Sequence, residues 1–528
     1  MRSRQGTLAE RAKREIFFNA VPALQISLVA LLPFLPFLLD FEAGEFNLAS
    51  RWNLFIAAGF VLLALLSRWV FFAFSLAFVP LSVLSIHLVS RFGGEDPGWR
   101  LNQPDARVET FFESPGSETF EYLGAHVAIE HWAMLAAGIA YLGLLAWTLA
   151  TRPSLSDPAK GAAAVMLAAW AAVAARVDAA QQLDRWPQYQ LVYAALEANA
   201  RYDRLAERDA ALEMRPLPAD SCTARYPKVV IVFGESVAPG HMSALGYPRR
   251  TTPFVDRSRP DILEALAPAN QTRVSLALML TPAVAEDFDA FYRLPSLVST
   301  LEACGYNTLW ISNQGRLGRH DSYTTSIAHE AARATFLNDM SYKEARRDGD
   351  LVQELSRLGA FDATRQATFI HLIGSHAAYR NRFPRGFGFP QVARVVDAYD
   401  SSILYTDSVL AELYQRFGAD GLLFIYVPDH GEVVSEKVFG HGFSPGFQEE
   451  YRVPLMIWNA DRAAMQKLRA ALGGRRLNLE SFDDVVGWLV GSRPTLRVST
   501  RTLVSNLAAG NLVHYEKLPA FPGSETQK

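Results

Sequence analysis

The stretch GLLFIYVPDHGE (421–432) is the most informative part of the sequence for the fold. A mostly apolar run ends abruptly at Pro428, and Asp429, His430 and Gly431 follow directly. A short apolar run bounded by turn residues is typical of a strand buried on both faces. The carboxylate and imidazole after it are either parts of an ordinary polar loop or two metal ligands. Which reading holds depends on what else lies at that edge of the sheet.

Other runs of the same character predict the remaining strands. They are KVVIVFG (228–234), NTLWIS (307–312), ATFIHLI (367–373) and VPLMIW (453–458). Helical segments such as 294–304 and 395–417 lie between them. Continuous apolar strands alternating with helices predict an α/β domain, with a mostly parallel sheet covered by helices on both faces.

Polar residues follow several of these strands, and ligands gather at the carboxyl ends of strands in open α/β sheets. The residues in question are Glu235, His376, Asp429, His430 and His441. Each alone has an ordinary explanation, such as a loop histidine or a glutamate at a helix N-terminus. Together, their oxygen and nitrogen donors suit a borderline divalent ion. Zinc is the leading choice, and manganese and magnesium remain open.

The first 180 of the 528 residues are dominated by apolar runs, whereas the rest has the composition of a soluble domain. The length suggests more than one domain, and the net charge of −3 gives no indication of nucleic-acid binding. So many long uncharged runs cannot all be buried in one small core, so we expect about five membrane helices. The runs are 16–39, 53–68, 70–90, 130–150 and 160–176.

Charge in the loops predicts the orientation of these helices. The N-terminal tail is basic, and the loop 91–129 is rich in acids. Basic segments stay in the cytoplasm, so an odd number of spans leaves the later residues outside it. We therefore expect a transmembrane domain over 1–177, a connector over 178–227 and a periplasmic catalytic domain over 228–528. The first run is too long for the apolar core of a signal peptide, so we expect no cleavage.

The chain contains two cysteines, Cys222 and Cys304. In an oxidising compartment they can pair, but two free buried thiols are equally compatible with the sequence.

Several motifs resemble the membrane-bound phosphoethanolamine transferases of the alkaline phosphatase and sulfatase superfamily. They are VVIVFGESVAPGHMSALGYPRRTTP (229–253), NQTRVSLALMLTPA (270–283), FIHLIGSH (369–376), AYDSSILYTD (398–407) and PDHGE (428–432). The match covers most of 228–460, and the five-span layout agrees with it. The GES form of the first motif and the few cysteines look more like the branch that acts on the lipopolysaccharide core than the lipid A branch.

The resemblance implies a metal site and a nucleophile. In that family a glutamate, a threonine nucleophile and an Asp-His pair hold zinc, which implies Glu235, Thr272, Asp429 and His430. Ser275 is the alternative nucleophile if the local register shifts by one turn.

The resemblance also implies residues near the substrate. These are His376, His441 and, in the loop 91–129, Glu118. Pro115 stands where an asparagine is expected, which puts polar contacts there in question. Ser236 is read as structural, because the family has its nucleophile in the second motif.

The implied activity is metal-dependent transfer of phosphoethanolamine from phosphatidylethanolamine to a cell-envelope glycolipid, either lipopolysaccharide core or lipid A. Thr272 would form a covalent phospho-threonine intermediate. The implied protein is a multi-pass component of the bacterial inner membrane, and we expect it to act as a monomer.

Three alternatives differ in head group or in class. A phosphoglycerol transferase would use the same layout, metal and threonine chemistry. A sulfatase needs a C/S-x-P-x-R pattern, and the nearest stretch, Ser492 to Leu496, ends in leucine where arginine is required. A non-catalytic membrane scaffold on a decayed enzyme fold would usually lose its metal ligands first, and here these are present.

Overall fold

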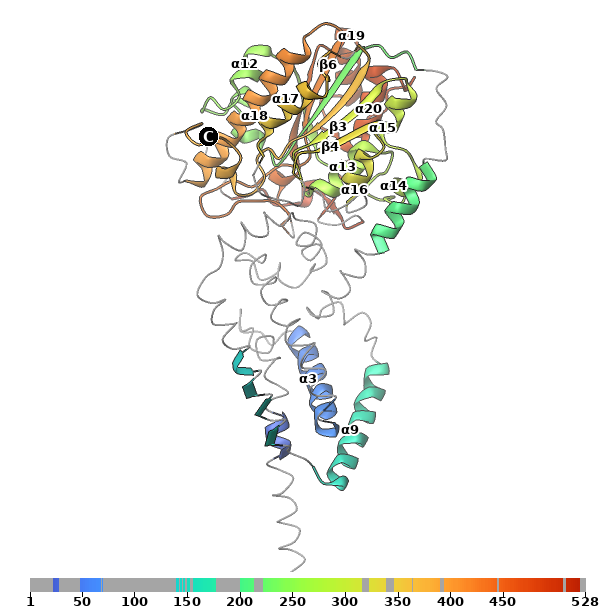
Figure 1. Ribbon diagram of the computed structural model, residues 1–528, viewed down its shortest axis with the longest axis vertical. Coiled ribbons are helices and arrows are strands. Elements are labelled where there is room, and N and C mark those ends of the chain that lie inside the picture. The colour runs from blue at the N-terminus through green and yellow to red at the C-terminus, as the bar shows by residue number, and fades with distance from the viewer. Residues whose placement is uncertain are drawn as a thin grey trace, which may run out of the picture. The chain divides into compact units, whose positions relative to one another are not determined.

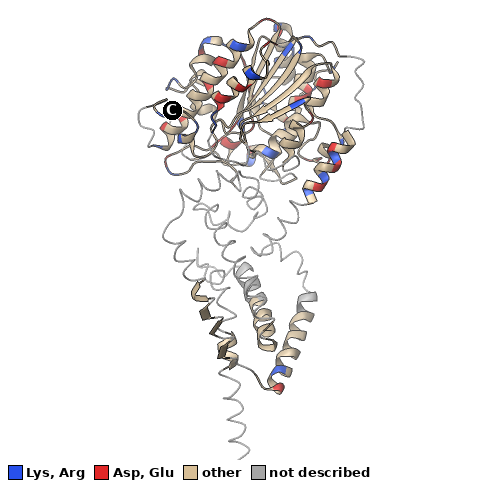
Figure 2. Cartoon of the chain, viewed as in Figure 1, with Lys and Arg blue, Asp and Glu red and all other residues tan. Residues whose placement is uncertain are grey.

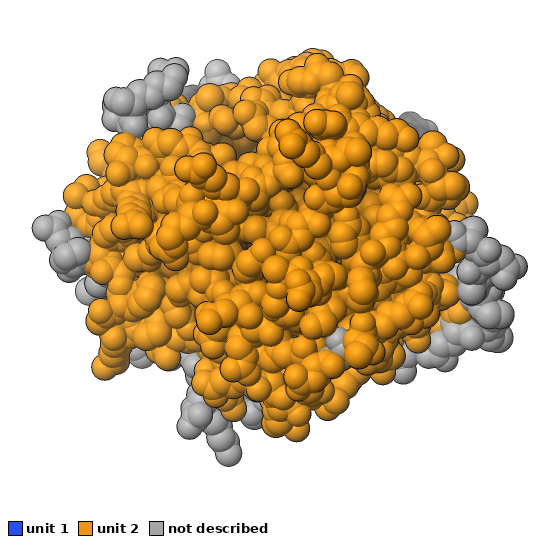
Figure 3. Space-filling model, turned by 90° about the horizontal axis from the view of Figure 1, so that it is seen from above, with its two compact units in different colours: residues 1–110, 122–197 blue, residues 111–121, 198–528 orange. Residues whose placement is uncertain are grey.

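The structure is a computed structural model that divides into two compact units. One comprises residues 1–110 and 122–197, and the other, orange in Figure 3, comprises 111–121 and 198–528. The described residues are 22–27, 48–67, 69, scattered positions between 139 and 151, 155–176, 200–212, 222–315, 322–338, 346–362, 364–389, 394–443, 446–506 and 510–522.

The first unit contains two helices that pack against each other, α3 (Leu48–Leu66) and α9 (Asp157–Arg176). The indole of Trp170 donates a 2.8 Å hydrogen bond to the carbonyl of Phe55, and the two rings stack with centroids 5.0 Å apart. Gly59 lies directly under the same indole, where any larger side chain would clash. This contact pairs the two helices closely.

These helices coincide with two of the predicted membrane runs, 53–68 and 160–176. Among the residues that the structure describes, no helix has the length and apolar character needed to cross a membrane. The runs 16–39, 70–90 and 130–150 lie wholly or largely outside the described residues. The transmembrane domain therefore stays a prediction.

The second unit is built on an eight-stranded sheet in the order β4-β3-β5-β1-β6-β7-β2-β8. All five predicted strands are present. They are β1 (Lys228–Gly234), β3 (Asn307–Ser312), β5 (Gln366–His371), β6 (Leu422–Pro428) and β7 (Arg452–Trp458). Only β7 runs antiparallel to its neighbours, so the prediction of a mostly parallel sheet is confirmed.

Three strands of this sheet were not predicted: β2 (Asp261–Leu266), β4 (Arg333–Phe336) and β8 (Leu477–Asn478). The sequence of β2, DILEAL, contains two acids, and its Glu264 is exposed. β4 and β8 are short and lie at the two edges of the sheet. None of the three has the continuous apolar run that marks a central strand.

Helices cover both faces of the sheet, and the alternation along β1 shows why (Figure 1). Val229, Ile231 and Phe233 point into one apolar core, and Val230 and Val232 point into the other. On the first face lie α13 (Thr272–Leu280), α14 (Ala290–Arg293), α15 (Leu297–Ala303), α16 (Tyr323–Ala328), α19 (Arg462–Leu472) and α20 (Phe482–Val490). On the second lie α12 (Pro253–Ser258), α17 (Asp348–Arg357) and α18 (Val395–Phe417).

Short elements complete the unit. They are η2 (Pro239–His241), η3 (Ser243–Leu245), η4 (Tyr379–Asn381), η5 (Gln448–Glu450), η6 (Leu479–Ser481), η7 (Tyr515–Lys517) and the hairpin of β9 (Leu503–Ser505) with β10 (Leu512–His514). Charged residues lie mainly on the helices and loops around the sheet (Figure 2).

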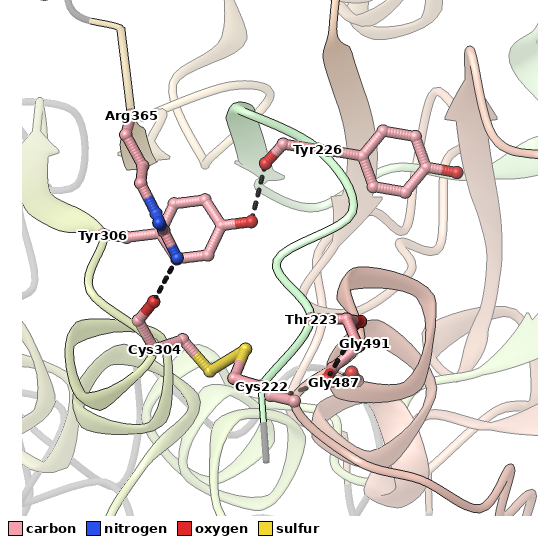
Figure 4. Close-up of a disulfide and its surroundings, with 9 residues drawn as sticks. Cys222, Thr223, Tyr226, Cys304, Tyr306, Arg365, Gly487 and Gly491 are labelled. Carbon is pink, nitrogen blue, oxygen red and sulfur yellow. Dashed lines mark hydrogen bonds between the residues drawn. A yellow bond between two sulfur atoms is a disulfide. The ribbon is translucent and has the colours of Figure 1, made fainter. Parts of the chain in front are cut away.

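The two cysteines form a disulfide, which resolves the alternative that the sequence left open (Figure 4). Cys304 caps the C-terminus of α15, and its Cα lies 5.5 Å from that of Cys222. The backbone amide of Thr223 donates to the carbonyl of Gly491, at the end of α20, over 3.0 Å. The segment entering β1 is therefore attached to two helices of the first face.

A helix over residues 200–212, inside the predicted connector, packs on the α/β unit. Its Arg208 is fully buried and donates to the Phe291 carbonyl over 2.9 Å and to the Ser326 hydroxyl over 3.0 Å. The guanidinium also pairs with Glu330. The guanidinium thus links this helix to α14, to α16 and to the residues that follow α16.

Candidate active site

The candidate site lies at the carboxyl ends of β1 and β6. These strands are parallel neighbours with Gly234 opposite Pro428, so Glu235 and Asp429 leave the sheet side by side. The amide of Asp429 donates to the Gly234 carbonyl over 3.1 Å, which extends the pairing by one residue. The prediction that these strand ends meet at one edge of the sheet is correct.

Side-chain atoms of four predicted site residues converge at this edge. Nε2 of His430 lies 3.2 Å from Oε1 of Glu235 and 3.4 Å from Oδ2 of Asp429. Thr272 begins α13, and its hydroxyl donates to Oε2 of Glu235 over 3.0 Å. The same hydroxyl oxygen lies 3.4 Å from Nε2 of His430.

The two serines that compete with Thr272 have other roles. Ser275, one turn along α13, is fully buried and donates its hydroxyl to the Asp429 carbonyl. Ser236 donates to Oε1 of Glu235 over 2.7 Å and has a left-handed backbone with φ of 58°. The Ser275 hydroxyl therefore holds the Asp429 backbone, and the Ser236 hydroxyl holds the Glu235 carboxylate.

The residues present fit a divalent metal ion. Oδ2 of Asp429 is buried and accepts no hydrogen bond from the described residues. Nδ1 of His430 lies 2.9 Å from the Gly431 carbonyl, so donation there directs Nε2 toward the carboxylates, where a metal ion would replace its proton. Glu235, Thr272, Asp429 and His430 would hold the ion, and this mixture of oxygen and nitrogen donors suits zinc.

Electrostatics support this assignment. Burial and the neighbouring Glu235 raise the pKa of Asp429 well above its ordinary value. Burial opposes the charged form of His430, but Asp429 and Glu235 raise its pKa to about 10. Two buried carboxylates this close need a neutralising cation, and a bound metal ion supplies that charge.

His441 lies across a small hairpin from Glu432. Val433 and Gly440 exchange two backbone hydrogen bonds of 2.9 Å, which brings the flanking residues opposite each other. Nδ1 of His441 then lies 2.8 Å from Oε2 of the buried Glu432, whose other oxygen accepts from the Tyr379 hydroxyl. The carboxylate fixes the orientation of the imidazole.

The predicted histidines form a row. The ring centroids of His430 and His441 are 4.0 Å apart, and those of His441 and His376 are 5.9 Å apart. His376 follows β5 and is partly exposed. Glu118, predicted to lie near the substrate, and the neighbouring Pro115 are outside the described residues.

The sequence reasoning missed two contributors to the site. Gln314, just after β3, donates to Oε2 of Glu235 over 2.7 Å and to the Leu372 carbonyl over 3.2 Å. Glu432 stood in the quoted motif PDHGE without an assigned role. Gln314 obeys the same rule that identified Glu235, because it too follows the carboxyl end of a parallel strand.

A buried aspartate shapes the loop between β5 and His376. Asp348, at the start of α17, accepts from the amides of Ile373 and Gly374 over 2.9 Å each. Gly374 has a φ of 48°, and a Cβ there would come within 2.9 Å of the Glu235 backbone nitrogen. The close approach of the loop to Glu235 therefore requires glycine.

The sulfatase family model matches residues 227–478 of this chain. The phosphoethanolamine transferase EptC of Escherichia coli K12 is 27% identical over 261 residues, which cover 44% of this chain and 45% of EptC. The chain thus spans about half the length of the curated relatives it matches.

Two solved structures share the fold. The C-terminal periplasmic domain of Escherichia coli EptC, in complex with zinc, aligns with a TM-score of 0.50 at 22% identity and covers 58% of this chain and 98% of that domain. The integral membrane protein EptA of Neisseria meningitidis aligns with a TM-score of 0.58 at 15% identity and covers 90% of this chain and 97% of EptA. These two structures confirm the predicted fold, and the sequence matches to the sulfatase family model and to EptC bear out the resemblance that the motifs indicated.

Proposed function

We propose that this chain, with its sulfatase-family domain over 227–478, transfers phosphoethanolamine from phosphatidylethanolamine to a cell-envelope glycolipid. The acceptor is lipopolysaccharide core or lipid A. Zinc is the metal, and Thr272 is the nucleophile. The proposal includes five membrane helices within 1–177, a connector over 178–227 and a periplasmic domain over 228–528.

The position of the Thr272 hydroxyl is the main support for this function. A threonine hydroxyl is a poor nucleophile at neutral pH, and here it lies within 3.4 Å of both Glu235 and His430. A bound divalent metal ion lowers the pKa of such a hydroxyl and offsets charge on the phosphoryl oxygens. Glu235 accepts the hydrogen bond from Thr272 and so orients the hydroxyl oxygen.

In the first half-reaction, the Thr272 oxygen forms a bond to phosphorus while the bond from phosphorus to the glycerol oxygen breaks. The hydroxyl proton leaves Thr272, and the departing diacylglycerol oxygen gains one proton. In the second half, a hydroxyl or phosphate oxygen of the acceptor forms a bond to phosphorus while the bond from phosphorus to the Thr272 oxygen breaks. Thr272 regains one proton, from the acceptor hydroxyl or, when a phosphate oxygen attacks, from solvent. Proton and charge balance therefore close over one cycle.

His441 and His376 are the side chains proposed to move protons and bind the substrate. Nδ1 of His441 lies 2.8 Å from Oε2 of Glu432, which orients the imidazole beside His430, where it would exchange a proton with a leaving or attacking oxygen. His376 lies next in the row and is partly exposed, as a substrate contact requires. Glu118 is the third proposed substrate contact.

A membrane anchor suits a lipid donor, because a tethered domain meets the lipid without extracting it into water. The name of EptC supports ethanolamine as the head group, and a phosphoglycerol transferase is the second candidate because its chemistry at Thr272 would be the same. A non-catalytic scaffold would leave the cluster of Thr272, Glu235 and His430 without a purpose.

Peptide mass spectrometry on protein purified from membranes tests the proposal. We expect a phosphoethanolamine adduct on Thr272, trapped by acid quenching after addition of phosphatidylethanolamine. A phosphoglycerol adduct would keep the mechanism and change the donor. An unmodified peptide together with protein free of metal would overturn the transferase in favour of the scaffold.

A further inference from the structure

Glu450 is a buried carboxylate outside the metal cluster. It ends η5, shortly before β7, and its side chain is fully buried. A buried carboxylate is costly unless donors surround it, so its partners indicate what it stabilises.

The carboxylate binds the loop that follows His441. Oε1 accepts from the Phe443 amide over 3.0 Å, and Oε2 accepts from the Phe447 amide over 2.6 Å. Phe443 is only two residues beyond His441. Phe443 and Phe447 are therefore both attached to Glu450, and the attachment of Phe443 restricts where the His441 backbone lies.

The same carboxylate binds the segment that leads to Thr272. Oε1 also accepts from the side-chain amide of Asn270 over 3.0 Å. Asn270 is fully buried and donates further to Oδ1 of Asn506 over 3.0 Å. Because Asn270 stands two residues before the first residue of α13, its anchoring determines where that helix starts.

The backbone of Glu450 reaches the third segment of the site. Its carbonyl accepts from the Gly431 amide over 2.8 Å, directly after His430. The approach is so close that a Cβ on Gly431 would lie 2.0 Å from the Glu449 carbonyl. One residue thus contacts all three segments that converge on the site.

We propose that Glu450 is a positioning residue that holds together the segments carrying the nucleophile and the two histidines closest to it. It touches neither substrate nor metal, and it acts through Asn270 and the loop 441–447. The expected effect of Glu450 on kcat rests on the proposed function, whereas its role in holding the three segments together does not.

The kinetic test compares Glu450→Ala with Glu450→Gln in the purified full chain, by release of diacylglycerol from phosphatidylethanolamine in mixed micelles. A small misplacement of the nucleophile lowers kcat strongly, so we expect Glu450→Ala to lower kcat about 30-fold with KM changed less than about twofold. Glutamine keeps one acceptor oxygen, and we expect it to restore kcat to within about threefold of wild type. Asn270→Ala combined with Glu450→Ala should lose little more than Glu450→Ala alone.

Glu480→Ala is the matched control, because Glu480 is also a buried carboxylate that accepts a side-chain hydrogen bond, from Ser499. Amide hydrogen exchange separates this inference from the proposed function, since it needs no activity. We expect Glu450→Ala, and not Glu480→Ala, to speed exchange at both 269–275 and 441–447. Unchanged exchange at either segment in Glu450→Ala would overturn the inference, and so would equal kinetic losses in Glu450→Ala and Glu480→Ala. If the wild type were inactive but the exchange changed as expected, only the proposed function would be overturned.

Discussion

The hydroxyl of Thr272 donates a 3.0 Å hydrogen bond to Oε2 of Glu235, across 37 residues of sequence. Thr272 is the first residue of helix α13, and Glu235 directly follows the last residue of strand β1. Strand β1, which Glu235 directly follows, and helix α13 pack in one apolar core, so the core sets the separation of the two residues. A hydroxyl held this way is oriented before any substrate arrives.

Thr272→Ala should abolish transfer, with a loss of at least about 1,000-fold, because the proposed covalent route runs through this hydroxyl. Thr272→Ser keeps a hydroxyl and should retain activity within about tenfold. Diacylglycerol release and the adduct on the peptide containing residue 272 report both effects.

Ser275→Ala is the control for that pair. Loss of the hydrogen bond from the Ser275 hydroxyl to the Asp429 carbonyl should lower the free energy of unfolding by about 1–3 kcal/mol. The adduct on Thr272 should persist. Full activity in Thr272→Ala would refute the assignment of the nucleophile.

Glu235→Gln and Asp429→Asn should each lower the metal content of the purified chain well below that of wild type, because each removes a charged ligand. Elemental analysis measures this without any assay of activity. Glu480→Gln, a buried carboxylate away from the cluster, should leave the metal content unchanged. Chelation should remove activity, and added zinc should restore it.

Glu432→Ala should lower kcat about 10- to 100-fold by releasing His441, while metal content stays constant. Tyr379→Phe removes the donor to the opposite carboxylate oxygen and should cost less. In a His441→Ala background, Glu432→Ala should have almost no further effect. Additive losses there would mean that Glu432 acts by a route other than His441.

Replacing both Cys222 and Cys304 by serine should destabilise the chain by about 4 kcal/mol, since the bond closes a long loop with a sequence separation of 82. The disulfide joins the end of α15 to the segment that enters β1, whereas Glu235 follows the opposite end of that strand. Activity at low temperature should therefore persist while the thermal midpoint falls. Wild type treated with reductant should behave like the double variant.

His371 should make stability depend on pH. Burial lowers its pKa from 6.5 to about 4, so between these values the unfolded chain binds the proton and the folded one does not. Stability should therefore fall as pH drops from about 6.5 to 4, by about 3 kcal/mol in all.

His371→Leu removes that titration and keeps an apolar neighbour for Phe233 and Trp310. Between pH 7.5 and 4.5, the thermal midpoint of wild type should fall by more than that of the variant. A constant difference would show that His371 does not titrate as described.

Strand prediction succeeded where burial on both faces leaves a continuous apolar run, as in β1 and β6. It missed β2, which pairs with β7 and β8, because its two acids, Asp261 and the exposed Glu264, interrupt the apolar run. The antiparallel direction of β7 could not be predicted from the sequence either, because an apolar run has the same pattern in parallel and antiparallel pairing.

The sequence by itself determined which residues stand at strand ends, since apolar runs and the polar residues after them are local features. This was enough to select Glu235, Asp429 and His430, and the motifs added Thr272. Only the tertiary structure showed that the Thr272 hydroxyl lies beside Glu235 and the Ser275 hydroxyl against the Asp429 carbonyl. It also joined Cys222 to Cys304, brought Gln314 and Glu432 to the site, and attached Glu450 to the segments that carry it. The physical reason is that these contacts join residues far apart in the chain, and their distances are set by how helices and loops pack on the sheet.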